Sequence, residues 1–559
     1  MRPPSRRRRV LAVATTALLI TPLLAASALA DQVTETDDDD DDAPELVWTP
    51  CEEVFECATL TVPLDHDGED GDDDDADDRD DDDVEGSDDD GSETIELAVI
   101  RRPAQDPDAR IGALVTNPGG PGGSGVDFVL GAGADDGFLA PLNERFDLVS
   151  WDPRGTKGSS PIDCVLDDEV EPFGAFPGLD DRDRVVEVAR DYIDACVESV
   201  GEELLASVST LDTTRDLELL RRALGEEHLT YLGFSYGTYL GATYASLYPE
   251  RVRAFVLDGA VDPDAYANDP LSSNAEQALG FETALTRYFD VCALDECLFD
   301  GDERDWRALV EALDAEPLET GEPARPVTGE DVVNATLIVM YVRPAWPILD
   351  QALAEAAAGD GARIKFLSDL ALGINDDGSV DPGADAFPAI TAIDAAYPND
   401  IAIQDQMFWT YVQSSPSFGP STFWASTAGG YAAFEWPVEA DDRFAGPFTY
   451  GEDDGPPIVV IGTTFDPATP FRGSIAMTEQ LGNATLLTMV GDGHTAYGGN
   501  SGCVDDAVDA FLTDLDVPDE GTICVQELAA AGAAVVGSDA TAVPADVMAL
   551  VRRFAGVAR

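Results

Sequence analysis

The most constraining feature of the sequence is a serine between two glycines, at the junction of two different hydrophobic patterns. Residues 229–233 form a short apolar run that is typical of a buried strand, and 237–248 have the spacing of a helix. Gly233 and Gly237 permit a sharp turn between these elements. We therefore expect Ser235 to stand above the edge of a sheet, at the N-terminal end of a helix. A plain turn serine is the alternative.

Short apolar runs surround this segment and alternate with helical patterns. The runs lie at 112–116, 146–151, 253–257, 457–464 and 484–490, and helical patterns lie at 214–224, 237–248, 273–289, 305–313 and 346–358. Strands that alternate with helices imply the α/β class, with a mostly parallel sheet covered by helices on both faces. Because the helical and aromatic-rich stretch falls between two strands of one sheet, we expect it to form a cap over the active edge.

The same patterns place boundaries along the chain. Strand patterns at 57–64 and 94–102 predict a hairpin, and an acidic loop at 67–92 connects its strands. No segment of this loop has the ligand spacing of an EF-hand, so we expect a solvated loop, with weak cation binding as the alternative. The expected parts are a disordered acidic leader (31–45), a core (46–262), a cap (263–455), a second core part (456–530) and a tail with a short helix (531–559).

The first residues have the pattern of an export signal. Arginines at 2 and 6–9 precede an apolar run at 10–26, and Ala-Leu-Ala at 28–30 supplies small residues for cleavage. The pattern predicts a signal peptide at 1–30, with a single membrane anchor as the alternative and the export route left open. No later apolar stretch is long enough for a membrane span. We therefore expect a secreted protein without membrane contact after signal removal.

The charge balance narrows the possible partners. Acidic residues outnumber basic ones by 111 to 32, and the runs at 37–42 and 67–92 account for only part of the excess. Such a surface repels nucleic acid and anionic lipid, so neither is an expected partner. The only lysines are Lys157 and Lys365. Short carboxylates with few lysines favour an enzyme adapted to high salt, where the Debye length falls to about 3 Å at 1 M.

The cysteines fall into local pairs in the exported part of the chain. An even number of cysteines in an oxidising compartment predicts disulfides, with buried free thiols as the alternative. None of them has the repeated spacing of a zinc site, so we expect no metal and no cofactor. The predicted pairs are Cys51 with Cys57, Cys164 with Cys196, Cys292 with Cys297, and Cys503 with Cys524.

A serine needs a base, and histidine has the most suitable pKa for that role. His66 lies beside the acidic loop, and His228 precedes the strand at 229–233, at the end opposite Ser235. His494 follows the strand pattern at 484–490 through a glycine-rich turn, which places it at the carboxyl edge of the sheet. His494 is therefore the predicted base, and a structural histidine is the alternative.

The acid that orients the base is predicted by its place in the chain. Asp466 follows the strand pattern at 457–464, and the order Ser, Asp, His is that of the α/β-hydrolase fold. Asp258, at the end of an earlier strand, is an alternative acid position. Asp492 is a weaker rival because it lies too close in sequence to His494.

A glycine-rich loop at 116–125 follows the strand pattern at 112–116, where this fold needs a donor for the oxyanion. We favour the N–H groups of Gly120 and Tyr236 as the two donors. A phosphate-binding loop is the rival, but no Gly-Lys-Ser/Thr follows.

Together these motifs resemble the secreted tripeptidyl aminopeptidases of actinobacteria, relatives of the prolyl aminopeptidases. The matching segments are 117–125, Asp-Pro-Arg-Gly at 152–155, 216–225, 233–241, 256–263, Asp-Pro-Ala-Thr-Pro at 466–470, Gly-His at 493–494 and 503–524. The resemblance implies serine-dependent release of tripeptides or shorter units from a free amino terminus. The acidic loop departs from the family, and 391–394 and 434–437 lack cysteines that relatives often carry, so one cap disulfide is expected to be missing.

A peptidase of this kind needs a carboxylate that meets the substrate ammonium at a fixed distance from the serine. Glu276, Glu282 and Asp394 are the candidates, and an ordinary solvated acid is the alternative for each. The rival activities are an esterase or amidase with the same triad, because the fold does not fix the acyl group, and an inactive, cation-binding surface protein.

Overall fold

The computed structural model describes residues 43–66, 93–135, 137–164, 174–295, 297–319, 325–375, 378–380, 383–398, 400–425, 436, 443–451, 455–527 and 551. The predicted signal peptide, most of the leader, the acidic loop at 67–92 and most of the tail lie outside these residues. The chain divides into Met1–Asp42 and Ala43–Arg559, and the described residues all belong to the second unit. In this part of the chain, no helix is long and apolar enough to cross a membrane.

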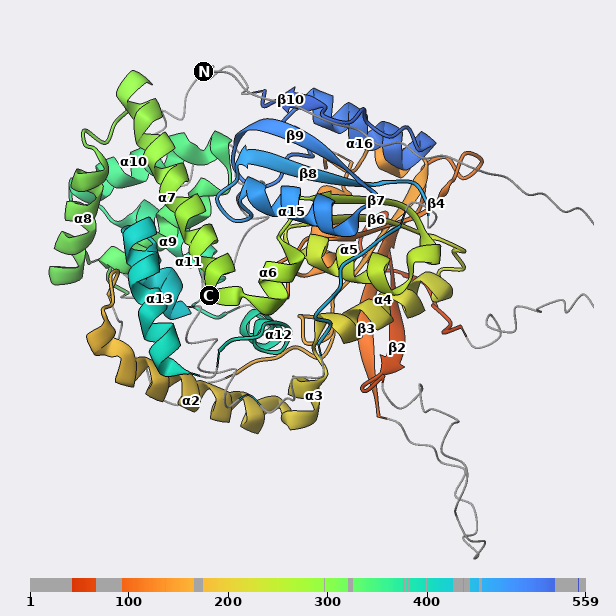
Figure 1. Cartoon of the computed structure of the whole chain (residues 1–559), viewed down its shortest axis with the longest axis horizontal. Helices are drawn as coiled ribbons and strands as arrows, with labels where there is room; N and C mark the ends of the chain where they lie inside the picture. The colour runs from red at the N-terminus through yellow and green to blue at the C-terminus, as the bar shows by residue number, and fades with distance from the viewer. Residues whose placement is uncertain are drawn as a thin grey trace, which may run out of the picture. The chain divides into compact units, whose positions relative to one another are not determined.

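The second unit is built on one ten-stranded sheet (Figure 1). Its strands are β1 (Thr49–Pro50), β2 (Glu56–Pro63), β3 (Thr94–Arg102), β4 (Gly112–Asn117), β5 (Phe146–Trp151), β6 (Leu229–Phe234), β7 (Val252–Asp258), β8 (Ile458–Phe465), β9 (Ala484–Asp492) and β10 (Ile523–Val525). Their order is β1-β2-β3-β5-β4-β6-β7-β8-β9-β10. The first three pairings are antiparallel, and all pairings from β5 to β10 are parallel. The predicted α/β-hydrolase fold is therefore confirmed.

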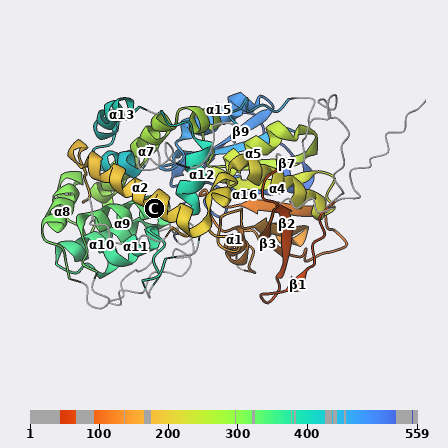
Figure 2. The ribbon, with the colours of Figure 1, turned by 90° about the horizontal axis from the view of Figure 1, so that it is seen from below.

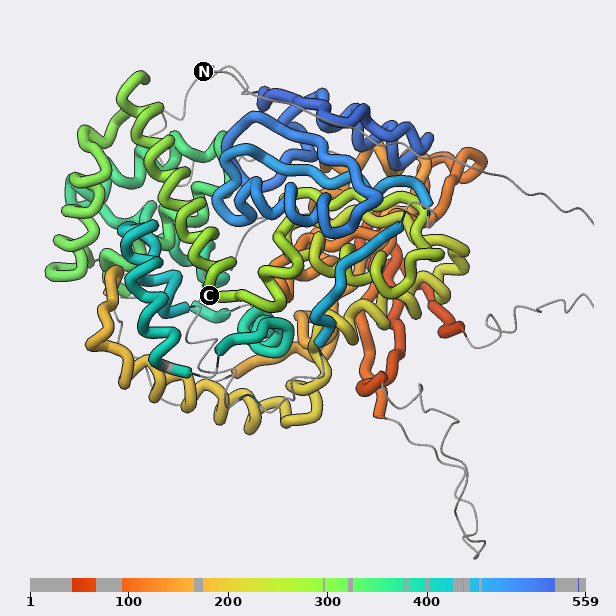
Figure 3. Tube along the Cα trace, viewed as in Figure 1, coloured from red at the N-terminus to blue at the C-terminus, as the bar shows by residue number. Residues whose placement is uncertain are grey.

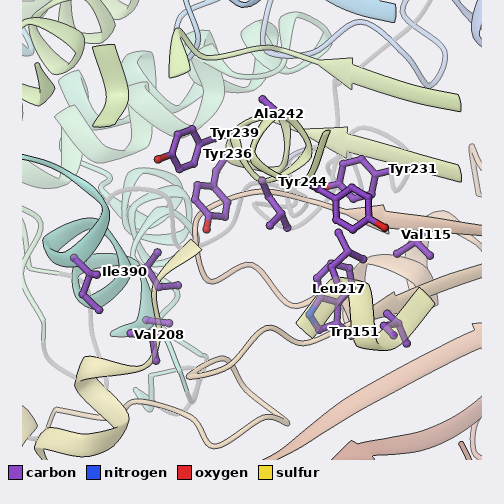
Figure 4. Packing of buried hydrophobic residues seen from close by; sticks show 14 of the residues in the cluster. Val115, Trp151, Val208, Leu217, Tyr231, Tyr236, Tyr239, Ala242, Tyr244 and Ile390 are labelled. Carbon is purple, nitrogen blue, oxygen red and sulfur yellow. The ribbon is translucent and has the colours of Figure 1, made fainter. Parts of the chain in front are cut away.

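Helices cover both faces of the sheet, because successive side chains of its buried strands point to opposite faces. In β4, Leu114 packs with α1 (Gly125–Ala132) and α16 (Gly502–Asp514). The next residue, Val115, belongs to a cluster on the other face with α4 (Thr210–Ala223), α5 (Tyr236–Leu247) and α15 (Phe471–Leu481). Figure 4 shows Tyr231 of β6, Tyr244 of α5 and Leu217 of α4 in this cluster.

The helical insertion after β7 forms the predicted cap. The chain leaves the sheet after β7, builds the cap and returns as β8 (Figure 3). The cap helices are α6 (Pro263–Asn268), α7 (Pro270–Asp295), α8 (Glu303–Ala315), α9 (Gly329–Met340), α10 (Trp346–Ala357), α11 (Ala362–Ala371), α12 (Ala386–Asp394) and α13 (Ile401–Ser414). Leu285, Trp306 and Leu349 belong to a buried core of their own within these helices. The cap therefore has enough apolar contact to hold a defined shape.

A helix from the first core part joins this layer. In α2 (Arg182–Val200), Val185 and Ala189 pack with Ala278 of α7 and Phe408 of α13. Figure 2 shows α2 beside the cap helices. The sequence patterns did not predict this helix. The cap is thus assembled from two separate stretches of the chain, together with α3 (Glu202–Ala206) as the link back to α4.

The cysteines form the four predicted disulfides and no cysteine is free. The bonds join Cys51 to Cys57, Cys164 to Cys196, Cys292 to Cys297, and Cys503 to Cys524. The third disulfide lies next to Asp350, and these are the only described side chains grouped closely enough to suggest a metal site. Because Asp350 accepts hydrogen bonds from the Leu298 and Phe299 N–H groups at 2.8 and 2.9 Å, it has a structural role.

Candidate active site

Ser235 lies at the sharp bend between β6 and α5. Its φ of 56° and ψ of −125° are unusual for a residue with a side chain. Hydrogen bonds on both sides hold this conformation. The Ser235 N–H donates to the Asp258 carbonyl at 2.9 Å, and the Thr238 N–H and hydroxyl donate to the Ser235 carbonyl at 2.8 and 2.5 Å. The bend thus fixes the serine at the carboxyl edge of the sheet, as predicted.

The two glycines that flank this bend are required by close packing. A Cβ atom on Gly233 would lie 2.4 Å from the Gly237 carbonyl oxygen, and one on Gly237 would lie 2.8 Å from the Asn117 carbonyl oxygen. Neither space can accept a methyl group without backbone movement. The two glycines of the G-x-S-x-G pattern are therefore needed because α5 lies so close to β6 and to the loop after β4.

The structure brings His494 and Asp466 together. The imidazole Nδ1 lies 2.9 Å from each carboxylate oxygen of Asp466, and both side chains are buried. Asp466 also accepts hydrogen bonds at 2.9 Å from the N–H groups of Ala468 and Thr469. These contacts hold the carboxylate still, so that it can orient the ring and stabilise its charged form.

Two residues that sequence reasoning missed also contact this pair. The Thr469 hydroxyl lies 3.1 Å from Asp466 Oδ2 and 3.2 Å from His494 Nδ1. The Tyr341 ring lies perpendicular to the imidazole, with 5.2 Å between the ring centroids. Its main-chain carbonyl accepts a hydrogen bond from the main-chain N–H of His494 at 2.8 Å. Thr469 lies inside the 466–470 motif and could have been found there. Tyr341 comes from the cap and has no local signal.

The two rival acids have other partners. Asp258 is fully buried and accepts hydrogen bonds from the N–H groups of Ala496 at 3.0 Å and Tyr497 at 2.8 Å. Asp492 pairs with the cap residue Arg287. Asp466, by contrast, lies with both carboxylate oxygens 2.9 Å from the imidazole Nδ1, so the geometry favours the predicted acid.

The end of β7 links the serine to the histidine. The Asp258 carbonyl binds the Ser235 N–H, and a Cβ atom on the next residue, Gly259, would lie 3.1 Å from Cε1 of His494. One short segment therefore touches both predicted catalytic residues. This segment places both residues at the same edge of the sheet, at the ends of β6 and β9.

The other two histidines lie elsewhere. His66 is buried, with Nε2 at 2.8 Å from Asp216 and 3.1 Å from Arg154, and His228 is exposed at the start of β6. Neither contacts the elbow, as expected.

The loop after β4 lies directly against the elbow. A Cβ atom on Gly119 would lie 2.9 Å from Cβ of Ser235 and 3.1 Å from the Tyr236 nitrogen. The Gly119 N–H already donates to Asn117 Oδ1 at 2.9 Å. Among the described residues, no backbone carbonyl outside the helices and strands accepts the Gly120 N–H, and the Tyr236 N–H begins α5, where no intrahelical acceptor exists. These two N–H groups are therefore available as oxyanion donors.

Two of the candidate amine-binding carboxylates lie on α7. Glu282 is buried and accepts hydrogen bonds from the Ser415 hydroxyl and from the N–H and hydroxyl of Ser417, at 2.9 to 3.0 Å. These contacts give it a structural role within the cap. Glu276 pairs with Arg472 at 2.6 Å, and 44% of its side chain is exposed. Of the two, Glu276 is the one that a ligand can reach.

The third candidate, Asp394, is buried between α12 and α4. Its carboxylate accepts the Thr210 N–H at 2.8 Å and the Thr210 hydroxyl at 2.5 Å, and that hydroxyl also contacts the Tyr236 hydroxyl. Burial raises the pKa of Asp394 to about 7. The structure therefore gives Asp394 the role of a cap-to-core contact instead of a ligand-facing group.

Asp394→Asn is expected to remove a pH-dependent cost of folding. In the unfolded chain this carboxyl ionises near pH 4, whereas in the folded protein its pKa is about 7. Because the folded protein keeps its proton longer than the unfolded chain, this group lowers the free energy of unfolding as the pH rises from about 4 to 7. Above pH 7 the free energy of unfolding falls no further from this cause. Relative to wild type, the variant should gain melting temperature at pH 8 but not at pH 4. A difference in melting temperature between variant and wild type that stays the same from pH 4 to pH 8 would contradict the raised pKa of Asp394.

Comparison with known proteins places these features in one family. The family model described as alpha/beta hydrolase fold matches residues 112–320, and the model described as TAP-like protein matches 426–524. Serine protease Hip1 of Mycobacterium tuberculosis is 33% identical over 505 residues, which cover 85% of this chain and 90% of that protein.

Two further relatives carry different names. Carboxylesterase B of Mycobacterium tuberculosis is 33% identical over 505 residues, which cover 86% of this chain and 90% of the relative. Tripeptidyl aminopeptidase of Streptomyces coelicolor is 31% identical over 422 residues, which cover 72% of this chain and 74% of the relative. The chain belongs to the TAP-like family of α/β-hydrolases and is a serine hydrolase.

Proposed function

We propose that the protein is a secreted serine exopeptidase that releases tripeptides or shorter units from the free amino terminus of peptides. The observation that carries this proposal is the buried pair of His494 and Asp466 at the edge where Ser235 stands on its bend. The Streptomyces relative named tripeptidyl aminopeptidase supports the choice of substrate.

In the proposed reaction, Ser235 Oγ attacks the scissile carbonyl carbon while His494 takes the hydroxyl proton. Asp466 holds the imidazole in the required tautomer and stabilises its charged form. The N–H groups of Gly120 and Tyr236 donate to the oxyanion. The C–N bond then breaks as His494 returns the proton to the leaving amine. Water repeats these steps on the acyl-enzyme and releases the amino-terminal fragment.

We assign recognition of the substrate ammonium to Glu276. The helix that carries it packs on the loop after Asp466, because Gln277 donates to the Ala468 carbonyl at 2.8 Å. A Cβ atom on Gly280 would lie only 2.4 Å from the carbonyl oxygen of the residue after Asp466. A carboxylate on this helix is therefore fixed relative to the catalytic loop. A fixed distance between the two supports selection of the length of the released unit.

Hydrolysis of esters or amides is the second candidate function. It is favoured by one observation, the relative named carboxylesterase B, which is as similar in sequence as the relative named serine protease. The same three side chains would serve both reactions, since the fold does not fix the acyl group.

A panel of fluorogenic substrates is expected to separate these activities. Tripeptides with a free amine should be cleaved with a kcat/KM up to about fivefold above that of the same peptides with a blocked amine, because an ion pair with a partly exposed carboxylate contributes about 0.2–1 kcal/mol. Nitrophenyl esters complete the panel. Faster turnover of blocked peptides and simple esters than of free tripeptides would contradict the exopeptidase assignment.

The matched variant for this panel is Glu276→Gln. It should raise KM for free-amine peptides and leave blocked peptides and esters unchanged. An equal effect on all three substrate classes would show that Glu276 does not recognise the amine. The exopeptidase assignment itself would not be affected.

We also propose export and adaptation to high salt. The signal-like sequence at 1–30 and four disulfides support an oxidising destination, and the net charge of −79 supports solubility in salt.

A further inference from the structure

An arginine from the cap contacts the ends of two adjacent core strands. Arg287, on α7, donates through Nη2 to Asp492 Oδ2 at 3.1 Å and through Nε to the other oxygen of the same carboxylate. The centre of its guanidinium group lies 3.5 Å from the centroid of the Phe465 ring. Phe465 ends β8, Asp492 ends β9, and the two residues are partners in the register of these strands. One side chain therefore binds both strand ends.

These strand ends lead directly into the proposed catalytic loops. Phe465 immediately precedes Asp466, and Asp492 lies two residues before His494. A bidentate pair to a carboxylate fixes both distance and orientation, and stacking on an aromatic face restrains the same guanidinium in a third direction. Arg287 thus contacts the residue that precedes Asp466 and the residue two positions before His494.

A second cap segment approaches the same place. Arg343 lies with Nε at 3.9 Å from Asp492 Oδ2, and its guanidinium stacks over the Trp346 ring at 4.1 Å. Two residues earlier, the Tyr341 carbonyl accepts the His494 N–H at 2.8 Å. The cap therefore holds the loop before His494 through two arginines and one main-chain hydrogen bond.

We propose that Arg287 is a positioning residue for catalysis, which acts through Asp492 and Phe465 to keep the Asp466 and His494 loops in register. This inference rests on the catalytic roles assigned under the proposed function. It makes the cap a part of the catalytic apparatus as well as a cover. The physical reason is that a shift of about 1 Å in a catalytic group can lower the rate about 100-fold.

Arg287→Met is expected to lower kcat about 10- to 100-fold and to change KM less than about threefold. The rate at which a fluorophosphonate labels Ser235 should fall by the same factor as kcat. Arg287→Lys, which keeps the charge but not the bidentate geometry, should recover part of the loss. Circular dichroism and thermal melting confirm that each variant is folded under the assay conditions.

The matched control is Arg325→Met, which removes another cap arginine that binds two carboxylates, Asp331 and Asp369. The side-chain exposure of Arg325 is 36%, close to the 33% of Arg287. This control should lose stability but keep kcat. The proposal is overturned if Arg287→Met keeps its kcat, or if Arg325→Met loses kcat to the same extent.

A second variant covers the case in which Arg287→Met does not fold. Asp492→Asn leaves the arginine in place, and it should lower kcat and the labelling rate in the same way. If it leaves both unchanged, the proposal is overturned. Because labelling does not require a peptide substrate, wild-type protein that is labelled but does not cleave free-amine peptides would refute the exopeptidase function alone. Labelling that does not occur at Ser235 would refute the triad and this proposal together.

Discussion

Replacing Asp466 with asparagine is expected to lower kcat about 10⁴-fold while KM stays close to its wild-type value. The carboxylate accepts a hydrogen bond from Nδ1 of His494, which leaves Nε2 free of a proton and able to act as a base. An amide in the same place can donate to Nδ1 and would favour the wrong tautomer. Steady-state kinetics on the best substrate of the panel provide the measurement, with Ser235→Ala as the background.

The two rival acids give the matched controls for this result. Asp258→Asn leaves the imidazole partner in place but weakens acceptance of the Ala496 and Tyr497 N–H groups, so its main effect should be on stability. Asp492→Asn should reduce kcat only to the smaller extent expected from positioning. If Asp466→Asn keeps more than about a tenth of the wild-type kcat while folded Asp258→Asn loses about 10⁴-fold, the acid has been wrongly assigned.

The elbow and the sheet could be predicted because their signals are local. Ser235 lies between a strand pattern and a helix pattern, and the apolar runs at 112–116, 146–151 and 253–257 each became a strand of the parallel sheet. The short edge strands β1 and β10 were not predicted, since two or three residues cannot show an alternating pattern. The helix α2 was missed although Val185, Ala189, Ile193 and Cys196 are buried at helical spacing.

The parts of the site that sequence could not supply depend on the cap. Tyr341, which follows α9, and Arg287 of α7 contact the catalytic loops from more than a hundred residues away in sequence, and no local pattern marks either residue. Burial also decides which acids can face a ligand. Glu282 and Asp394 resemble surface acids in the sequence, yet tertiary contacts satisfy both carboxylates inside the structure.

A buried ion pair elsewhere in the core shows why the Asp-Pro-Arg-Gly motif matters for folding. Arg154 is fully buried and binds Asp216 in two places, each at 2.7 Å. It also donates to the carbonyls of Pro63 at 3.0 Å and Ser207 at 2.6 Å, so one side chain connects the end of β2, α4 and the end of α3. Burial alone would raise the pKa of Asp216, but the Arg154 charge and the hydrogen bond from His66 outweigh it and lower the pKa.

Arg154→Met is therefore expected to cost about 3–5 kcal/mol of stability, because it leaves the Asp216 carboxylate buried without its cation. Against a total of about 5–15 kcal/mol, this loss brings the protein close to unfolding. Urea denaturation followed by circular dichroism measures it. The matched control is Arg110→Met, since Arg110 also binds two carboxylates but its side chain is 37% exposed, so it should cost at most about 1 kcal/mol.

The pH dependence of this difference tests its cause. In wild type, the lowered pKa of Asp216 contributes stability above about pH 4, and this stability is lost as the pH falls through the folded pKa. In Arg154→Met, the buried carboxyl has no cation beside it, so the variant becomes more stable when Asp216 takes up a proton. The gap between the two proteins should therefore narrow as the pH falls, above about pH 4 because the variant gains stability and below about pH 4 because wild type loses it. The double variant Arg154→Met/Asp216→Leu should recover part of the loss at neutral pH, because an apolar pair replaces an unpaired charge. A gap that is independent of pH, with no recovery in the double variant, would mean that Arg154 acts through packing and its main-chain hydrogen bonds instead of through the ion pair.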